Sequence, residues 1–159
     1  MTAMPDIAAG IPHADHRGGR DLPFVTFIEG LDIQVLQADI KGGLWVVRAR
    51  FLPGVTLPRH KHTGPVCALT NSGSWKYLEY PEVNVAGSYL FEPAGSIHTL
   101  HVPANNTEVT EAWFAINGAN LNLNDKGDVD SVWDAKFVLE AYLGLCAQAG
   151  YPKPPVIVN

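Results

Sequence analysis

The stretch Gly54-Val-Thr-Leu-Pro-Arg-His60-Lys-His62 carries two histidines separated by one residue. Successive side chains of a β-strand point to opposite faces, so His60 and His62 in a strand share one face, about 7 Å apart along the chain. Two imidazoles on one face can bind the same metal ion. This stretch therefore predicts a strand that supplies two neighbouring metal ligands.

A second stretch, Gly87-Ser-Tyr-Leu-Phe-Glu-Pro93-Ala-Gly95-Ser-Ile-His98, supplies a third histidine. Proline fixes φ and glycine permits a positive φ, so the Pro-x-Gly turn starts the next strand in a defined direction. We expect His98 to join His60 and His62 in one metal site. Three neutral imidazoles leave the full +2 charge on a metal and up to three open positions on one side.

Short apolar or alternating runs, separated by turns rich in glycine and proline, surround both stretches. Such runs predict β-strands, and no helical pattern lies between them. This arrangement is typical of an antiparallel sandwich or barrel and argues against a doubly wound α/β fold. The predicted strands cover residues 24–28, 33–40, 44–51, 66–70, 75–80, 88–91, 99–102 and 109–116.

The hydrophobic period changes after residue 127, where apolar residues recur at every fourth position. This period predicts an amphipathic helix whose apolar stripe covers one side of the barrel or a subunit contact. Ser131 is the expected N-cap, Asp134 the first-turn acid, and Gly150 with Pro152 the stop signal. The predicted stripe consists of Trp133, Phe137, Ala141 and Leu145, with Val138 and Tyr142 alongside.

We expect one domain in three parts. Residues 1–22 are polar and glycine-rich and form a flexible arm, residues 23–125 form the barrel, and residues 126–159 form a helix and tail packed on it. A chain of 159 residues is long enough to bury roughly 68–70% of its unfolded surface without disulfides or a structural metal. A metal bound here is therefore expected to be functional.

The charge and the cysteines exclude several classes of partner. The net charge is −5 and no stretch concentrates Lys and Arg, so we expect no nucleic acid or membrane partner. No apolar run approaches the roughly 18 residues of a membrane span, and no signal segment is recognisable. Cys67 and Cys146 have no metal or redox spacing, which favours thiols in a cytoplasmic protein.

Both histidine stretches resemble the two sequence motifs of the cupin family. The first motif is matched at Gly54, His60, His62 and Gly73. The second motif, with its Pro-x-Gly turn, is matched at Gly87, Pro93, Gly95 and His98. The resemblance implies an all-β fold, a cupin jelly-roll β-barrel with the C-terminal α-helix added.

Two positions depart from the cupin motifs. The acid of the first motif falls on Val66, or on Cys67 with the longer spacing, and the final asparagine of the second is Val102. Valine cannot bind a metal. The predicted site therefore has three neutral histidines and no carboxylate ligand.

Residues 43–116 also resemble 2,4′-dihydroxyacetophenone dioxygenase and its relatives. This resemblance implies a homo-oligomer, a dimer or tetramer, in which His60, His62 and His98 bind non-haem iron(II). It implies cleavage of the C–C bond of a hydroxylated aryl ketone by dioxygen, giving an aromatic acid and formate, as in aromatic compound degradation. A purified sample could instead carry nickel, zinc or manganese.

Such a reaction needs a base for a substrate C–H proton, and Glu92 and Glu79 are the candidates. Glu92 lies six positions before His98 and could act as the base or contact a ligand imidazole. Strand parity puts Trp75 and Tyr77 on the same face as Glu79, a candidate pocket wall.

Further candidates lie around these residues. Trp113 and Glu111 share a face of their strand and could extend an aryl pocket. Arg48 and Arg50 could pair with a substrate anion, although a surface role suits them better. His101, three positions after His98, should face away from the metal.

Two other functions stay open for such a site. One is a non-oxidative metal enzyme, an isomerase or hydrolase that uses zinc, nickel or manganese as a Lewis acid. The other is a non-enzymatic sensor of metal or small molecules, like the cupin domains attached to zinc-binding anti-sigma factors. Oxygen-independent turnover would identify the first.

Overall fold

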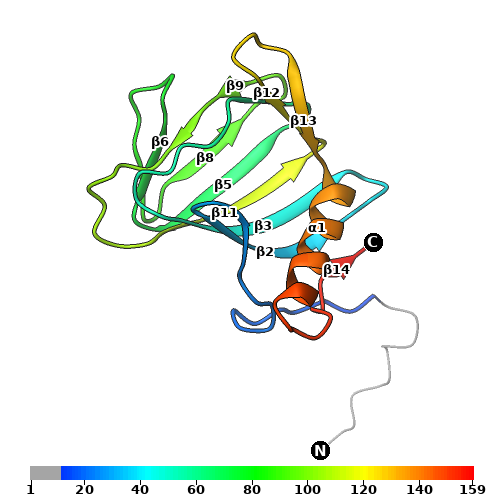
Figure 1. Ribbon diagram of the computed structural model, residues 1–159. Coiled ribbons are helices and arrows are strands. Elements are labelled where there is room, and N and C mark those ends of the chain that lie inside the picture. The colour runs from blue at the N-terminus through cyan, green and yellow to red at the C-terminus, as the bar shows by residue number, and fades with distance from the viewer. Residues whose placement is uncertain (1–11) are drawn as a thin grey trace, which may run out of the picture.

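The computed structural model describes residues 12–159, so the first half of the predicted arm lies outside the described residues. Curved antiparallel sheets enclose a common interior, and a C-terminal helix lies along one side of the largest sheet (Figure 1). The predicted all-β jelly-roll barrel with a C-terminal helix is therefore confirmed.

The largest sheet has seven strands. Its path runs β1-β2-β3-β11-β5-β8, and β14 pairs with β2 in parallel. Neighbouring strands along the path are antiparallel. These strands are β1 (Val25–Ile28), β2 (Leu31–Ala38), β3 (Leu44–Phe51), β11 (Thr110–Asn117), β5 (Val66–Ser72), β8 (Tyr89–Glu92) and β14 (Ile157–Val158).

Two smaller sheets complete the barrel. A four-stranded sheet has the order β13-β12-β4-β9, and a three-stranded sheet has the order β10-β6-β7. The sequence patterns predict strands at residues 75–80 and 99–102 in these sheets. The histidine stretch predicts one more. The observed strands are β13 (Val129–Trp133), β12 (Asn120–Leu123), β4 (His60–His62), β9 (Ile97–His98), β10 (Leu100–His101), β6 (Ser74–Tyr77) and β7 (Asn84–Val85).

Alternating burial along the strands builds the core. On β3 the inward side chains of Trp45, Val47, Ala49 and Phe51 are buried, while Arg50 between them is exposed. β11 runs antiparallel beside β3, with Leu44 opposite Asn117 and Phe51 opposite Thr110. Burying one large apolar side chain contributes roughly 1.5–3 kcal/mol, so this two-residue period fixes which face of the sheet turns inward.

The helix α1 (Ala135–Gln148) begins one residue after Asp134, whose carboxylate accepts a hydrogen bond from the Phe137 amide at 2.8 Å. Asp134 is therefore the N-cap, and the prediction of Ser131 for that role was wrong because Ser131 lies in β13. The helix ends before Gly150, which takes a φ of 81°. Glycine adopts this left-handed conformation without the strain that a Cβ would bring.

The face of α1 that packs on the barrel is the Val138 and Tyr142 side of the predicted stripe, and the Phe137 side is turned outward. Val138, Leu139, Tyr142 and Cys146 are buried, whereas Phe137 is 45% exposed. The helix is apolar on two adjacent faces, so the four-residue period alone could not tell which one meets the barrel. The Phe137 side instead borders an open groove beside Phe27 and Trp133.

The turn between β5 and β6 depends on Gly73. This residue has a φ of 68°, and a Cβ there would lie 2.6 Å from the Thr110 Cα atom. Only glycine lets the chain cross so close to β11. The close crossing directs β6 into the barrel wall.

Part of the segment before β1 is held against the barrel. Leu22 is buried, and the Gln34 amide donates hydrogen bonds to the carbonyls of Gly19 and Leu22.

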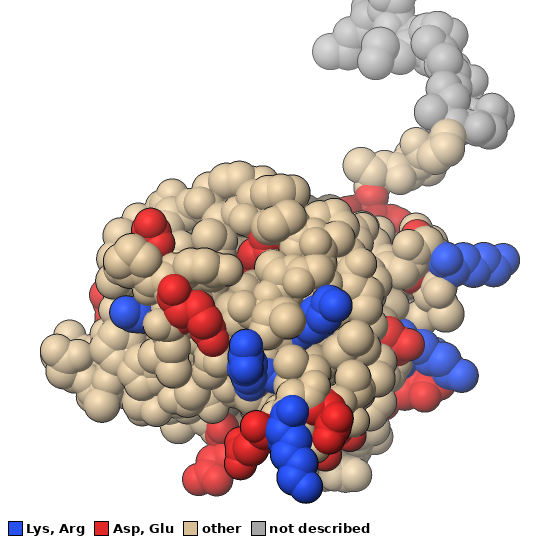
Figure 2. All heavy atoms as spheres, turned by 90° about the horizontal axis from the view of Figure 1, so that it is seen from above, with Lys and Arg blue, Asp and Glu red and all other residues tan. Residues whose placement is uncertain are grey.

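Seen from above, Lys and Arg side chains alternate with Asp and Glu and form no broad patch of one sign (Figure 2). Within residues 12–159, no helix is long and apolar enough to span a membrane.

Candidate metal centre

Three buried histidines from two neighbouring strands meet inside the barrel. β4 supplies His60 and His62, and β9 supplies His98, which lies directly opposite His60 in the antiparallel pair. One nitrogen atom from each ring can be chosen so that all three lie within 4.8 Å of one another. The structure thus brings together the three histidines that the sequence predicted.

His60 is prepared to bind a metal through Nε2. Its Nδ1 lies 2.9 Å from the Pro58 carbonyl oxygen and donates a hydrogen bond to it, which leaves the lone pair on Nε2. Burial, aided by the nearby His62 and His98, lowers the pKa of His60 to about 4. The ring is therefore neutral at pH 7, as a metal ligand must be.

A carboxylate lies against two of the histidines, and it belongs to Glu92, for which a contact with a ligand imidazole was one of the two predicted roles. Glu92 Oε2 lies 2.8 Å from His62 Nε2 and 3.1 Å from His98 Nε2. Burial raises the pKa of Glu92, but the two imidazoles and the Tyr77 hydroxyl outweigh burial and hold this pKa at about 2. Glu92 is therefore ionised at neutral pH.

These polar atoms converge without satisfying one another. Within the described residues, His62 Nε2, His98 Nε2 and Glu92 Oε2 are buried and have no hydrogen-bond partner, because their contacts are short but poorly aligned. Buried polar groups are nearly always hydrogen-bonded. Three buried, unpaired nitrogen and oxygen atoms close to one another therefore indicate a site for a cation. Imidazole nitrogen and carboxylate oxygen suit divalent iron, zinc, manganese or nickel, and the residues present fit such an ion.

Tyr77, on β6, holds both a histidine and the carboxylate. Its hydroxyl donates a 2.5 Å hydrogen bond to Glu92 Oε1. Its ring stacks on His98, with centroids 3.7 Å apart and an interplanar angle of 15°. Burial and the Glu92 charge raise the pKa of Tyr77, so the hydroxyl keeps its proton and remains a donor.

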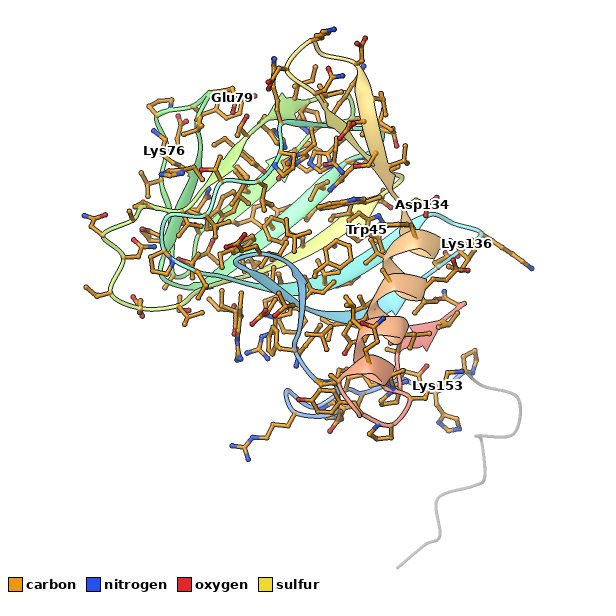
Figure 3. The ribbon with its side chains drawn as sticks, in the orientation of Figure 1. Trp45, Lys76, Glu79, Asp134, Lys136 and Lys153 are labelled. Carbon is orange, nitrogen blue, oxygen red and sulfur yellow. The ribbon has the colours of Figure 1, made fainter. Side chains whose placement is uncertain are left out.

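An apolar cavity adjoins the histidines. His60, His62 and Tyr77 line one part of it, and aliphatic and aromatic side chains line most of the rest. One of these is Trp45 of β3, which is labelled in Figure 3. The cavity suits a ligand with an apolar body and one polar end.

Two predicted residues of β6 and its following turn lie near the site without lining the cavity. Trp75 is completely buried, packs edge-on against Tyr77 and donates its indole N–H to Thr70. Glu79 is exposed at the rim, where its carboxylate accepts hydrogen bonds from the Thr99 amide and hydroxyl (Figure 3). Trp75 therefore packs against Tyr77 on the side away from the cavity. The Glu79 carboxylate is bonded to Thr99 and does not contact the histidines.

The prediction that Trp113 and Glu111 line the pocket was wrong. Both lie on the outer face of β11, because the inward positions belong to Ala112, Phe114 and Ile116. Glu111 accepts hydrogen bonds from Arg48, Arg50 and Asn71 on that outer face. Both arginines are thus paired with Glu111 on the outer face, away from the cavity.

His101 also lies outside the histidine cluster, as predicted, with Nδ1 against the Thr56 hydroxyl.

Sequence reasoning missed two cavity residues, Asn120 and Asn122 of β12. Each is directly opposite a metal-site histidine: Asn120 opposite His62, and Asn122 opposite His60. The alternation Asn-Leu-Asn-Leu at residues 120–123 was an available strand signal. It was hard to use because the polar residues, which usually face solvent, here face inward.

A jelly-roll barrel with a His-x-His strand, a third histidine after a Pro-x-Gly turn and an adjoining apolar cavity defines a cupin. The sequence model of the ChrR cupin-like domain family matches residues 16–119. The chain therefore belongs to the ChrR cupin-like domain family.

Solved structures support the same fold. A protein of unknown function with a cupin-like fold from Ralstonia eutropha JMP134 is 35% identical, with 94% of this chain and 96% of that chain covered and a TM-score of 0.85. An RmlC-like cupin from the same strain is 26% identical over 89% and 92% of the two chains, with a TM-score of 0.83.

An acetylacetone dioxygenase from Acinetobacter johnsonii is also similar in fold. It shares 18% identity over 85% of this chain and 93% of that chain, with a TM-score of 0.73. No curated protein sequence matches this chain.

Proposed function

We propose that this protein is a metal-dependent dioxygenase that uses iron(II) to cleave the C–C bond of a hydroxylated aryl ketone such as 2,4′-dihydroxyacetophenone. The observation that carries the proposal is the buried cluster of His60, His62, His98 and Glu92 beside an apolar cavity. The acetylacetone dioxygenase from Acinetobacter johnsonii is an example of a dioxygenase with this fold, and its named substrate is a small ketone.

The three histidines would hold the metal, and Glu92 lies against His62 and His98. Iron(II), when bound, supplies electrons to dioxygen and polarises substrate oxygens. The reaction balances as aryl hydroxymethyl ketone plus O2 giving aromatic acid plus formic acid. The bond between the carbonyl and hydroxymethyl carbons breaks, and each of these carbons gains one oxygen atom.

The chain's own residues have distinct roles in this proposal. The apolar cavity wall binds the aryl ring and excludes water. Glu92 is the carboxylate nearest the histidines and takes up the C–H proton. Tyr77 holds Glu92 Oε1 by its hydrogen bond, so Oε2 stays directed at the cluster where the substrate reacts.

Oxygen uptake tests the proposal. The purified protein would be stripped of metal, loaded anaerobically with iron(II), and supplied with 2,4′-dihydroxyacetophenone, 2-hydroxyacetophenone or acetylacetone. We expect uptake with a hydroxyketone and the matching aromatic acid and formate by chromatography. His98→Ala is the inactive control, and no uptake with any compound at full iron occupancy contradicts the proposal.

The match to the ChrR cupin-like family favours a second candidate, a domain that senses a metal or small molecule without catalysis. Tight metal or ligand binding without turnover, in the presence or absence of oxygen, would identify this candidate. Turnover without oxygen would instead indicate a non-oxidative isomerase or hydrolase.

We also propose that the protein forms a homo-oligomer. Leu69 of β5 and Tyr89 and Phe91 of β8 are each more than half exposed on the outer face of the large sheet. Leu69 and Tyr89 lie directly opposite each other, so the apolar area is continuous. Light scattering after size exclusion should give a mass of at least two chains, and Tyr89→Lys should reduce it.

A further inference from the structure

The amide of Asn120 faces the cavity beside the candidate metal centre. β12 pairs with β4 so that Asn120 lies directly opposite His62. Residues opposite each other in antiparallel strands point to the same face, with Cβ atoms about 4.5–5.5 Å apart. Asn120 is only 8% exposed and lines the cavity together with His62. Its amide is therefore within a few ångströms of any ligand that reaches the histidines.

Asn120 differs from its neighbour Asn122 in one respect. The Asn122 amide donates a 3.0 Å hydrogen bond to the Ser131 hydroxyl. The Asn120 Oδ1 atom is buried and has no hydrogen-bond partner within the described residues. A buried amide oxygen without a partner lowers stability, so its presence beside a cavity points to a partner that comes with a ligand.

The surroundings narrow the chemistry of that partner. Among the described residues that line the cavity, none is a lysine or arginine. A ligand carboxylate or phosphate therefore has no cation besides the metal itself to neutralise it. A neutral hydroxyl group suits the site, because it donates to an amide oxygen and also accepts from an amide N–H.

We infer that Asn120 is a specificity-determining residue that hydrogen-bonds a hydroxyl group of the substrate and selects hydroxylated over unhydroxylated aryl ketones. This inference rests on the proposed function and adds the residue that sets its specificity. A substrate analogue without the hydroxyl would leave the buried amide without a hydrogen-bond partner. A site of this kind discriminates strongly against such an analogue.

Binding without turnover tests the selection. Zinc-loaded protein, kept anaerobic, would be titrated with acetophenone, 2-hydroxyacetophenone and 4′-hydroxyacetophenone, with the fluorescence of the cavity residues Trp45 and Trp133 as the signal. We expect Asn120→Leu to lower the preference of the wild type for a hydroxylated probe about tenfold. The probe that loses affinity identifies which hydroxyl the amide contacts. A preference that survives in Asn120→Leu overturns the inference.

A stability measurement tests the same residue without any ligand. In metal-free protein, Asn120→Leu should leave the melting temperature unchanged or raise it, because no hydrogen bond is lost. The matched variant Asn122→Leu should lower it, because it breaks the bond to Ser131. If Asn120→Leu melts as low as Asn122→Leu, or alone fails to fold, the amide is structural and the inference is wrong.

The two measurements separate this inference from the proposed function. Binding of none of the three probes to the wild type contradicts the proposed substrate class. Equal affinity of the wild type for all three probes contradicts only the inferred role of Asn120. The oxygen-uptake assay then still tests the proposed function.

Discussion

Val66 and Glu92 lie directly opposite each other on the neighbouring strands β5 and β8, and both are buried inside the barrel. Val66 stands at the position where the first cupin motif has its acid. Because opposite residues share a face with Cβ atoms about 4.5–5.5 Å apart, Glu92 brings a carboxylate to nearly the same place from the adjacent strand. The carboxylate beside the histidines therefore comes from the strand next to the motif position, and the first motif alone does not predict it.

Glu92→Gln should weaken metal binding about 10–100-fold, because it removes the negative charge beside His62 and His98. Titration calorimetry with zinc would measure this change. Glu79→Gln is the matched control and should change the affinity less than twofold, since Glu79 binds Thr99 at the rim. The double variant Val66→Glu with Glu92→Val should recover part of the lost affinity. Unchanged affinity in Glu92→Gln would show that the carboxylate does not contribute to metal binding.

His60→Ala, His62→Ala and His98→Ala should each reduce the bound metal to less than about one-tenth of the wild-type content, because each removes one converging ligand atom. His101→Ala should keep its metal, since His101 contacts Thr56 outside the cluster. Metal analysis of the four purified variants by mass spectrometry provides the comparison. Equal loss in His101→Ala would mean that the variants lose metal through general destabilisation.

Tyr77→Phe removes the hydroxyl donor to Glu92 and keeps the ring stacked on His98. A buried hydrogen bond to a charged group contributes about 1.5–3 kcal/mol, and we expect the free energy of unfolding to fall by about this amount. Urea unfolding of the metal-free protein measures it. The rate of oxygen uptake should also fall, because Glu92 loses its fixed orientation. Wild-type values for both quantities would rule out this role for Tyr77.

Acid should destabilise the metal-free protein in two steps. The pKa of His60 is lowered by burial from 6.5 to about 4, so between these pH values the unfolded chain holds a proton that the folded chain lacks. The free energy of unfolding therefore falls as the pH drops from 6.5 to 4, by roughly 3 kcal/mol in all. The contacts that hold the pKa of Glu92 at about 2 add a further loss below pH 4.5.

Urea unfolding at a series of pH values separates the two steps. His60→Asn should flatten the profile between pH 6.5 and 4 and leave the region below unchanged. Glu92→Gln should flatten it only below pH 4.5. A profile that is flat for the wild type between pH 6.5 and 4 would mean that His60 titrates normally.

Glu111→Gln should lower the free energy of unfolding by about 1–3 kcal/mol, because the carboxylate joins Arg48, Arg50 and Asn71 across three strands. Metal content and oxygen uptake should stay at wild-type values, since this cluster is on the outer face. Thermal unfolding and the uptake assay together check both parts. A change in the KM for the substrate without a change in stability would mean that Glu111 does line the pocket.

The main features of the fold and the three histidines could be predicted because their signals are local. The strand parity of His60 and His62 and the turn before His98 fix where these side chains point. The face of β11 could not be assigned in the same way. Both of its faces carry apolar residues, Phe114 on one and Trp113 on the other, so only the packing of the sheet decides which turns inward.

The carboxylate and the amides of the site depend on pairing between strands. Glu92 was a candidate from its spacing to His98, but its contact with His62 follows from the register of β8 on β5. Asn120 belongs to a strand whose inward residues are polar, which reverses the usual pattern. Register between distant segments is set by the whole barrel and has no local code.

Gly73 contributes no atom to the metal centre, yet it belongs to the motif that predicts it. Its missing side chain lets β6 cross against Thr110, and β6 carries Tyr77. Gly73 therefore supports the metal centre from a distance, because Tyr77 both stacks on His98 and directs the carboxylate of Glu92. A related sequence with the three histidines intact and a larger residue at this corner would lose both contacts together.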